Sequence, residues 1–93
     1  MTLIGRKILE QFARRHADVR GQLDVWAAEV EEAEWRTPSE IKARYASASF
    51  VSNRVIFNLK GNKYRLDTKI SFKNQLVLIM RIGTHEEYST WKF

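Results

Sequence analysis

The closing stretch of the chain, RIGTHEEYSTWKF, contains side chains that can bind anions and transfer protons. Arg81 ends an apolar run, and His85 and Tyr88 follow three residues apart, a spacing that places them on one face of a helix. Lys92, four residues beyond Tyr88, falls on the same side. An arginine can hold a phosphate through two parallel hydrogen bonds, and an imidazole, with a pKa of about 6.5, can act as acid or base. Such a set suits metal-free RNA cleavage, in which a 2′-hydroxyl loses a proton and attacks the adjacent phosphate.

Each of these residues also has a structural interpretation. Arg81 could turn outward from the end of its strand, Tyr88 and Trp91 could pack the last helix on a sheet, and His85 could cap that helix. Each residue taken alone favours a structural role. The expectation that these side chains lie together on one sheet face favours a catalytic role. Tyrosine, with a pKa of about 10, is a poor base unless neighbouring cations lower that pKa. The choice between His85 and Tyr88 as the base therefore stays open.

A second basic group lies in segment 63–73, which has the clearest strand pattern of the chain. Apolar and polar side chains alternate there: Tyr64, Leu66, Thr68, Ile70 and Phe72 on one face, and Lys63, Arg65, Asp67, Lys69, Ser71 and Lys73 on the other. Side chains on one face of a strand are about 7 Å apart, which resembles the spacing of phosphates along a nucleic acid. A charged, solvent-facing side of a sheet gives the same pattern, and the strand alone favours that interpretation.

Hydrophobic periodicity predicts helices in the first half of the chain and strands in the second. We expect a short strand at 1–4, helices at 5–17, 19–35 and 38–45 with the first two joined near 18–21, strands at 54–60, 63–73 and 76–82, and a terminal helix at 84–93. Thr37 and Thr84 should each begin a helix in a capping box with the glutamate three residues later. A two-residue turn at 61–62 should join the first two of these strands. The order predicts an α+β fold, with N-terminal helices packed on a small antiparallel meander sheet, a short C-terminal helix and a partly open second face.

Length and composition narrow the class of protein. The 93 residues suffice for one domain, 1–93, with 44% hydrophobic and 29% charged residues, as in ordinary folded domains. The absence of cysteine excludes a disulfide framework and fits a reducing cytoplasm. No apolar run is long enough to span a bilayer, and the first residues lack the apolar core of a signal peptide. There is no glycine-rich phosphate loop, and the two histidines are far apart, so we expect neither a cofactor nor a metal.

Positive charge is concentrated in the second half of the chain. Residues 1–49 hold eight lysines and arginines against eight acids, whereas residues 50–93 hold eight against three, which places the whole net charge of +5 there. This asymmetry suggests an anionic partner, with nucleic acid first, although a solubilising surface would look the same. The acids at 29, 31, 32 and 34 form a solvated helix face or receive a basic partner segment.

Two motifs resemble the HigB-type toxins of the RelE superfamily, the mRNA-cleaving half of type II toxin–antitoxin pairs. The stretches FNLKGNKYRL and IGTHEEY occur in the family's order and spacing, and TPSEIKARYASASFV resembles the segment before its hairpin. The resemblance implies a RelE-like microbial ribonuclease fold and metal-independent, endonucleolytic cleavage of mRNA in the ribosomal A site, which inhibits translation. It also implies a HigA-like helix-turn-helix antitoxin as the partner in a toxin–antitoxin hetero-oligomer.

The same resemblance assigns residues to the site. The positions that match the family's motifs are the expected catalytic residues Arg65, Arg81, His85 and Tyr88, with Lys60, Lys63, Lys69 and Lys92 as expected RNA contacts. Two other functions use the same basic face. A non-catalytic module would bind RNA without cutting it, and a protein-interaction domain would bind an acidic partner without any effect on RNA.

Overall fold

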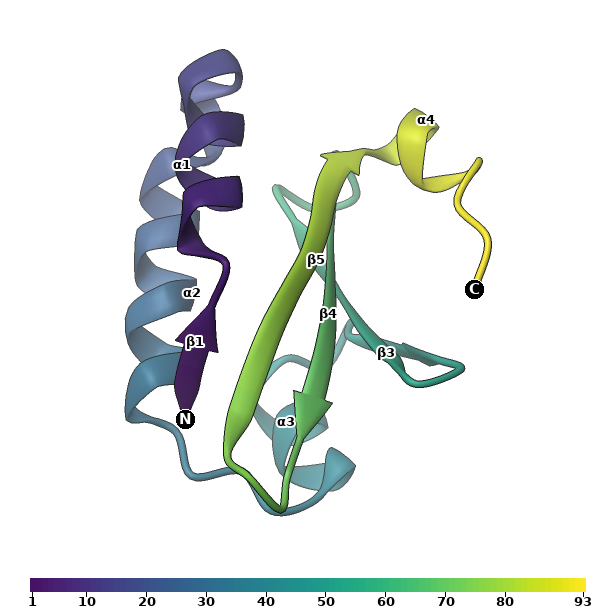
Figure 1. The fold of residues 1–93 in the computed structure, drawn as a ribbon. Coiled ribbons are helices and arrows are strands. Elements are labelled where there is room, and N and C mark those ends of the chain that lie inside the picture. Colours follow the sequence, from purple (N-terminus) through teal and green to yellow (C-terminus); the bar gives the residue numbers. More distant parts are fainter.

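A five-stranded sheet forms the centre of the computed structural model, which describes residues 1–93 (Figure 1). The strands are β1 (Thr2–Ile4), β2 (Ser49–Val51), β3 (Arg54–Leu59), β4 (Tyr64–Ser71) and β5 (Leu76–Thr84), and their spatial order is β1-β5-β4-β3-β2. Strands β2 to β5 form an antiparallel meander, whereas β1 pairs with β5 in parallel. The predicted α+β fold, its meander and its opening strand are confirmed. The sheet is mixed rather than purely antiparallel, and β2 was not predicted.

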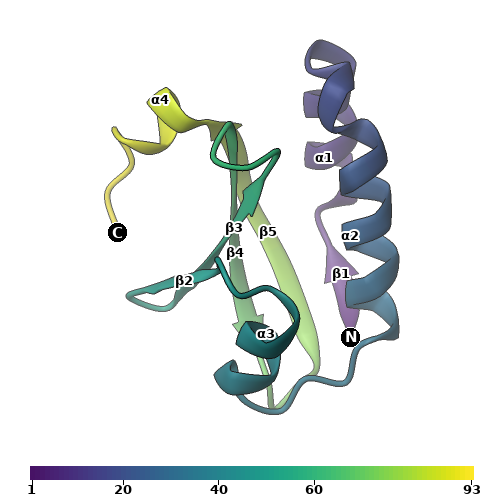
Figure 2. The same ribbon diagram turned by 180° about the vertical axis from the view of Figure 1, so that it is seen from behind.

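The helices are unevenly distributed over the two faces of this sheet. They are α1 (Arg6–Arg15), α2 (Arg20–Glu32), α3 (Pro38–Arg44) and α4 (His85–Tyr88), with a 3₁₀ turn, η1 (Ala17–Val19), between α1 and α2. Helices α1 and α2 cover one face, while α4 and the C-terminal residues lie on the other (Figures 1 and 2). None of the helices has the length and apolar character needed to cross a membrane.

The hydrophobic core lies between α1, α2 and the sheet. Alternate residues of the strands point to this helix-covered face, including Phe57, Leu66 and Val77, all almost completely buried. Trp26 of α2 packs edge-on against Phe57, with ring centroids 5.3 Å apart. Burying each such side chain stabilises the fold by about 1.5–3 kcal/mol, so this layer fixes how the sheet lies against the helices.

The predicted break between the first two helices is slightly misplaced. Helix α1 ends at Arg15, the chain turns at His16 and through η1, and Gly21 lies inside α2 rather than in the joint. The buried Val19 anchors this turn in the core. Gly21, the last residue of the expected joint, is therefore tolerated as the second residue of α2 by packing elsewhere, at a cost of up to about 1 kcal/mol.

Two predictions about local turns are wrong. The hairpin between β3 and β4 uses four residues, 60–63, and the positive φ angles fall on Lys60 and Gly61 rather than on Gly61 and Asn62. At the start of α3, Thr37 and Pro38 hold the predicted positions, but Thr37 makes no side-chain cap. The carboxylate of Glu40 accepts a hydrogen bond from the backbone N–H of Arg36 instead.

A bulge between β4 and β5 decides which way Arg81 faces. Asp67 pairs with Arg81, but the next pair is Thr68 with Ile79, so Met80 is an extra residue in β5. In a regular strand Arg81 would share the face of Ile79 and enter the core, because side chains alternate. The extra residue reverses this order and turns Arg81 to the face opposite the helices.

The C-terminal helix is much shorter than predicted. Thr84 and Glu87 form the expected capping box, but α4 ends at Tyr88 and the last residues form an irregular tail. The hydroxyl of Ser89 donates to the carbonyls of His85 and Glu86, both at 2.9 Å. Such bonds from serine to the preceding turn favour the end of a helix. The tail then folds back over the open face of the sheet, where it contributes to the site.

Candidate active site

Arg65 lies on the sheet face opposite α1 and α2, and only 8% of it is exposed. One Nη1 hydrogen bond to the backbone carbonyl of Asn62, 2.7 Å long, holds the guanidinium at the end of β4. The ring of Tyr88 lies over it, with 5.2 Å between the guanidinium carbon and the ring centroid. The cross-strand neighbour is Gly83, whose lack of a side chain leaves room for α4 and the tail. The structure thus brings two of the four predicted catalytic residues, Arg65 and Tyr88, into contact.

Three aromatic rings hold the C-terminal tail over this face. Tyr88 packs edge-on against Trp91 with centroids 5.6 Å apart, and Phe93 lies 6.4 Å from Tyr88. Trp91 in turn stacks on the guanidinium of Arg81 at 4.3 Å. Cation–π contacts of this kind contribute about 0.5–2 kcal/mol each, which is enough to place a short tail. Tyr88 and Trp91 therefore pack against the sheet, as the structural interpretation of these residues predicts.

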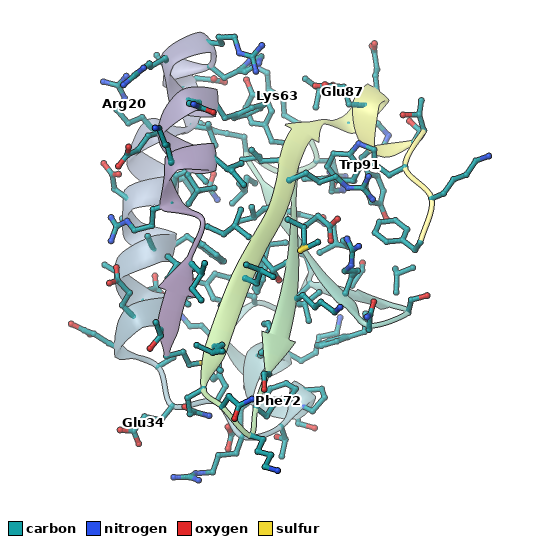
Figure 3. All side chains as sticks on the ribbon, in the orientation of Figure 1. Arg20, Glu34, Lys63, Phe72, Glu87 and Trp91 are labelled. Carbon is teal, nitrogen blue, oxygen red and sulfur yellow. The ribbon has the colours of Figure 1, made fainter.

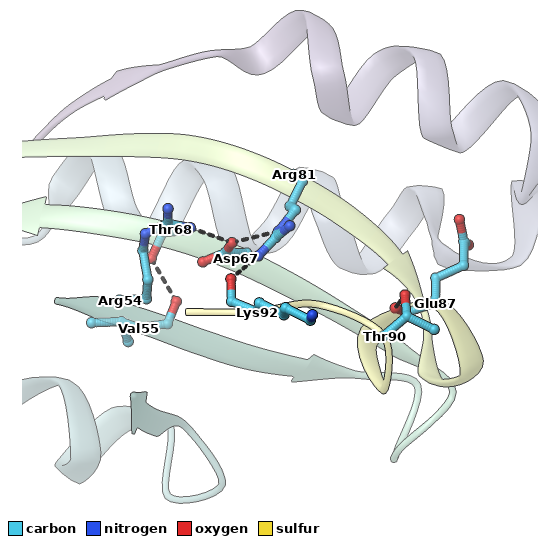
Figure 4. A network of polar contacts seen from close by, with 8 residues as sticks. All are labelled: Arg54, Val55, Asp67, Thr68, Arg81, Glu87, Thr90 and Lys92. Atoms are coloured by element: carbon cyan, nitrogen blue, oxygen red, sulfur yellow. Dashed lines mark hydrogen bonds and ion pairs between the residues drawn. The ribbon is translucent and has the colours of Figure 1, made fainter. Parts of the chain in front are cut away.

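Arg81 takes part in a buried ion cluster rather than standing free (Figure 4). Its Nε donates to Asp67 Oδ2 at 2.8 Å, and Nη1 of Arg54 donates to the same oxygen at 2.6 Å. Asp67 is completely buried, and its Oδ1 has no hydrogen-bond partner. The expectation that the polar face of segment 63–73 is a solvated charged surface is wrong at Arg65 and Asp67, because the tail and the two flanking arginines cover them.

His85 points to a different place from Tyr88, although both belong to α4. The backbone N–H of His85 donates to the carbonyl of Lys63 at 2.9 Å, and its imidazole makes no hydrogen bond. The side chain lines an open hollow at the end of the sheet that faces α1. Helix α4 is capped by Thr84, so the alternative of His85 as the cap is wrong. Arg65 and Arg81 lie on the adjacent inner strands β4 and β5, and His85 follows the end of β5, so the three do not form one contact cluster.

The four lysines expected to contact RNA are all exposed, but they do not form one row. Lys60 and Lys63 flank the β3–β4 turn, and Lys63 is held by an ion pair to Asp18, 2.8 Å from Nζ to Oδ2. In Figure 3, Lys63 lies toward α1 while Trp91 lies on the far side of the sheet. Lys69 is in the middle of β4, and Lys92 is in the tail.

Sequence reasoning missed several residues of this region. Arg54 shares Asp67 with Arg81 and lies 5.9 Å from the ring of Phe93. Its place at the start of a strand, at even spacing from Ile56 on the same face, could have identified it once β3 and β4 were paired. His16, after the end of α1, and Asp18, in η1, contact Tyr64, and Asp18 also contacts Lys63, on the helix-covered side of the sheet; strand pairing gives no sign of these contacts.

The fold and this face define a small α+β domain whose second sheet face carries arginines under an aromatic tail. Three arginines, Arg54, Arg65 and Arg81, gather there against the single carboxylate of Asp67. Side chains of this kind recognise phosphate, and no group of three or more histidine, aspartate or glutamate side chains is placed to hold a metal ion. The residue types on this face suit the binding of a phosphate group.

The profile of a family described as HigB_toxin, the RelE-like toxic component of a toxin–antitoxin system, matches residues 19–91. The chain belongs to this family. It is 25% identical over 91 residues to the mRNA interferase toxin HigB of Escherichia coli strain K12, an alignment that covers 95% of this chain and 88% of that protein. The mRNA interferases HigB of Escherichia coli O157:H7 and of Shigella flexneri match to the same extent. The predicted HigB-type relationship is confirmed, and with it a RelE-like toxin domain.

Proposed function

We propose that this toxin is an endoribonuclease that cleaves mRNA and so inhibits translation. The observation that carries the proposal is the contact between Arg65 and Tyr88, 5.2 Å from guanidinium carbon to ring centroid, on the basic face of the sheet. A guanidinium that can bind phosphate and a phenol that can transfer a proton, side by side, suit the transesterification of RNA. Relatives that carry the name mRNA interferase, aligned over 88% of their length, also support the proposal.

The proposed reaction uses side chains alone. The 2′-oxygen attacks the adjacent phosphorus as it loses its proton, the P–O5′ bond breaks, and the 5′-oxygen gains a proton. The products are a 2′,3′-cyclic phosphate and a 5′-hydroxyl. Arg65 binds the non-bridging oxygens, whose charge increases in the transition state, and Tyr88, which lies against Arg65, transfers a proton. His85 lies apart from this pair in the hollow that faces α1, so the choice between His85 and Tyr88 as the base stays open. Arg81 positions the tail and the face rather than the phosphate, because its Nε is committed to Asp67.

The proposed substrate is mRNA bound in the ribosomal A site. The positive charge of residues 50–93 supports binding to RNA, with Lys60, Lys63, Lys69 and Lys92 as phosphate contacts around the site. The proposed partner is a HigA-like helix-turn-helix antitoxin that forms a hetero-oligomer with this domain. Because the substrate and ribosomes are there, we propose that the toxin acts in the cytoplasm.

The test is to induce the chain without an antitoxin and to map RNA ends. We expect growth arrest, together with new mRNA fragments that begin with a 5′-hydroxyl. Purified protein should produce the same ends on ribosome-bound mRNA, also in the presence of a chelator that removes transition metals but leaves the ribosomal Mg²⁺. Fragments that begin with a 5′-phosphate, or growth arrest without new ends, would contradict the proposed reaction.

A further inference from the structure

The last residues of the chain cover arginines of the open sheet face. The ring centroid of Trp91 lies 4.3 Å from the guanidinium carbon of Arg81. The ring of Phe93 lies 5.3 Å from the same carbon and 5.9 Å from the guanidinium carbon of Arg54. We call residues 91–93 the strap, and Figure 4 shows part of it beside the buried ion cluster. The rings of the strap thus occupy the space in front of two of the three arginines.

The strap also holds Tyr88 over the third arginine. The rings of Trp91 and Phe93 lie 5.6 Å and 6.4 Å from the ring of Tyr88, which in turn covers Arg65. Arg65 is only 8% exposed, and its Nη1 already donates to the carbonyl of Asn62. A phosphate that is held by two parallel hydrogen bonds needs an open edge of the guanidinium. The phosphate therefore reaches Arg65 only after the ring of Tyr88 has moved aside.

The contacts that hold the strap are few and easily reversed. No backbone–backbone hydrogen bond involves residue 92 or 93, and the hydrogen bond from Arg81 to the carbonyl of Lys92 is long, at 3.5 Å. Helix α4, by contrast, has its capping box and a hydrogen bond from the backbone N–H of His85 to the carbonyl of Lys63. The strap can therefore lift from the sheet while α4 stays in place.

We propose that the strap inhibits the toxin by holding the arginine face closed, and that the RNA displaces it. The inference rests on the proposed function, because an RNA phosphate is the group that competes with the rings for the guanidinium groups. One cation–π contact changes the ratio of closed to open molecules by roughly 2- to 30-fold. The apparent affinity for RNA falls in proportion to the fraction of molecules that are open.

Modification of arginine by phenylglyoxal tests the closed state in the free protein, without RNA. Peptide mass spectrometry gives a reaction rate for each arginine, and Arg20, an exposed residue of α2, is the internal reference. Trp91→Ala should raise the rate at Arg65 about tenfold and leave the rate at Arg20 unchanged. Trp91→Phe, which keeps a ring over Arg81, should stay close to the wild type. Phe93→Ala removes a ring that is 43% exposed, so the fold should survive, and it should raise the rate at Arg65 about threefold.

A titration with RNA that carries 2′-O-methyl groups tests whether the RNA displaces the strap. The heteronuclear NOE of residues 92 and 93, measured by NMR, should fall to that of a mobile chain end when the RNA binds. Trp91→Ala should bind the RNA about tenfold more tightly than the wild type, because its face is already open.

The outcomes separate this inference from the proposed function. Equal reaction rates at Arg65 in the wild type, Trp91→Ala and Phe93→Ala would overturn the strap even if mRNA ends appear as expected. Weaker RNA binding by Trp91→Ala would also overturn it, because the ring would then be an RNA contact. Slow modification of Arg65 that Trp91→Ala relieves, together with no RNA binding, would support the closed strap and contradict the proposed function.

Discussion

Asp67 is the residue on which the arginines of the open face converge. Its buried carboxylate accepts from Arg54 and Arg81 through the same oxygen, while the other oxygen has no partner. Pairing two flanking cations with one buried anion leaves positive charge on the face and fixes where it lies. Breaking a buried pair costs far more than breaking a surface pair, because the remaining charge stays buried without its partner.

Replacing this aspartate should therefore destabilise the protein strongly. Asp67→Ala removes two charge-assisted hydrogen bonds and leaves two partly exposed arginines, so it should lower the free energy of unfolding by about 1.5–3 kcal/mol, measured by urea denaturation. The control is the exposed ion pair of Arg6 and Glu31. Glu31→Ala should change the free energy of unfolding by about 1 kcal/mol or less. A loss at Asp67 as small as that at Glu31 would show that the cluster does not hold the face together.

At this scale the sequence identified residue types but not their pairings. Motifs and spacing mark Arg65, Arg81, His85 and Tyr88, which stay predicted site residues. That Tyr88 covers Arg65 while His85 turns to His16 depends on the exact path of one helical turn. Spacing along the chain does not contain that information.

At the scale of elements, β5 and α4 place the site. The bulge at Met80 turns Arg81 away from the core, and Gly83 leaves space above Arg65. The meander of β3, β4 and β5 followed from alternation and turn signals, which are local, whereas β2 and the parallel pairing of β1 with β5 did not. A bulge depends on the pairing register of two strands, and the apolar run around Ile79 does not indicate one.

Gly83 provides a direct test of how α4 is positioned. A Cβ at this position would lie 2.9 Å from Trp91 and 3.2 Å from Glu87, so Gly83→Ala should push α4 and the tail off the sheet. We expect the rate of mRNA cleavage to fall at least about tenfold, since small displacements of catalytic groups are costly. Circular dichroism and thermal unfolding should show the rest of the fold intact.

The matched control is the same substitution in α2. A Cβ at Gly21 meets nothing within 4 Å, so Gly21→Ala should keep activity and stabilise the helix by about 0.5–1 kcal/mol. Unchanged cleavage by Gly83→Ala would mean that α4 need not lie close to the sheet for the reaction.

At the scale of the whole molecule, the two halves of the chain form different parts of the fold. The neutral first half supplies α1, α2 and most of one side of the core, and the basic second half supplies the meander and the arginine face. Composition and periodicity were enough to predict this division and the α+β class. Packing of the closing residues on the sheet was expected from Tyr88 and Trp91, but the stacking of Trp91 on Arg81 is a long-range contact that composition and periodicity do not give.

The charge of the second half predicts how RNA binding responds to salt. With about five phosphates neutralised, affinity for a single-stranded RNA should fall about 100-fold between 50 and 200 mM salt. The measurement uses RNA with 2′-O-methyl groups, which cannot be cleaved. Lys69→Gln should reduce the slope by about 0.7, and Lys7→Gln, in the neutral half, should not change it. A slope near zero would indicate that the basic face serves a protein partner.

The most direct test of the central claim is cleavage by Arg65→Lys. Lysine keeps the positive charge but loses the planar fork that holds two phosphate oxygens, whereas Arg20→Lys changes an exposed arginine of α2 and serves as the control. Purified variants with wild-type circular dichroism and melting temperature are compared by mapping 5′-hydroxyl ends on ribosome-bound mRNA. We predict at least about a 100-fold lower rate for Arg65→Lys and an unchanged rate for Arg20→Lys. A folded Arg65→Lys protein that cuts mRNA as fast as the wild type would contradict the assignment of Arg65 as the group that binds the phosphate.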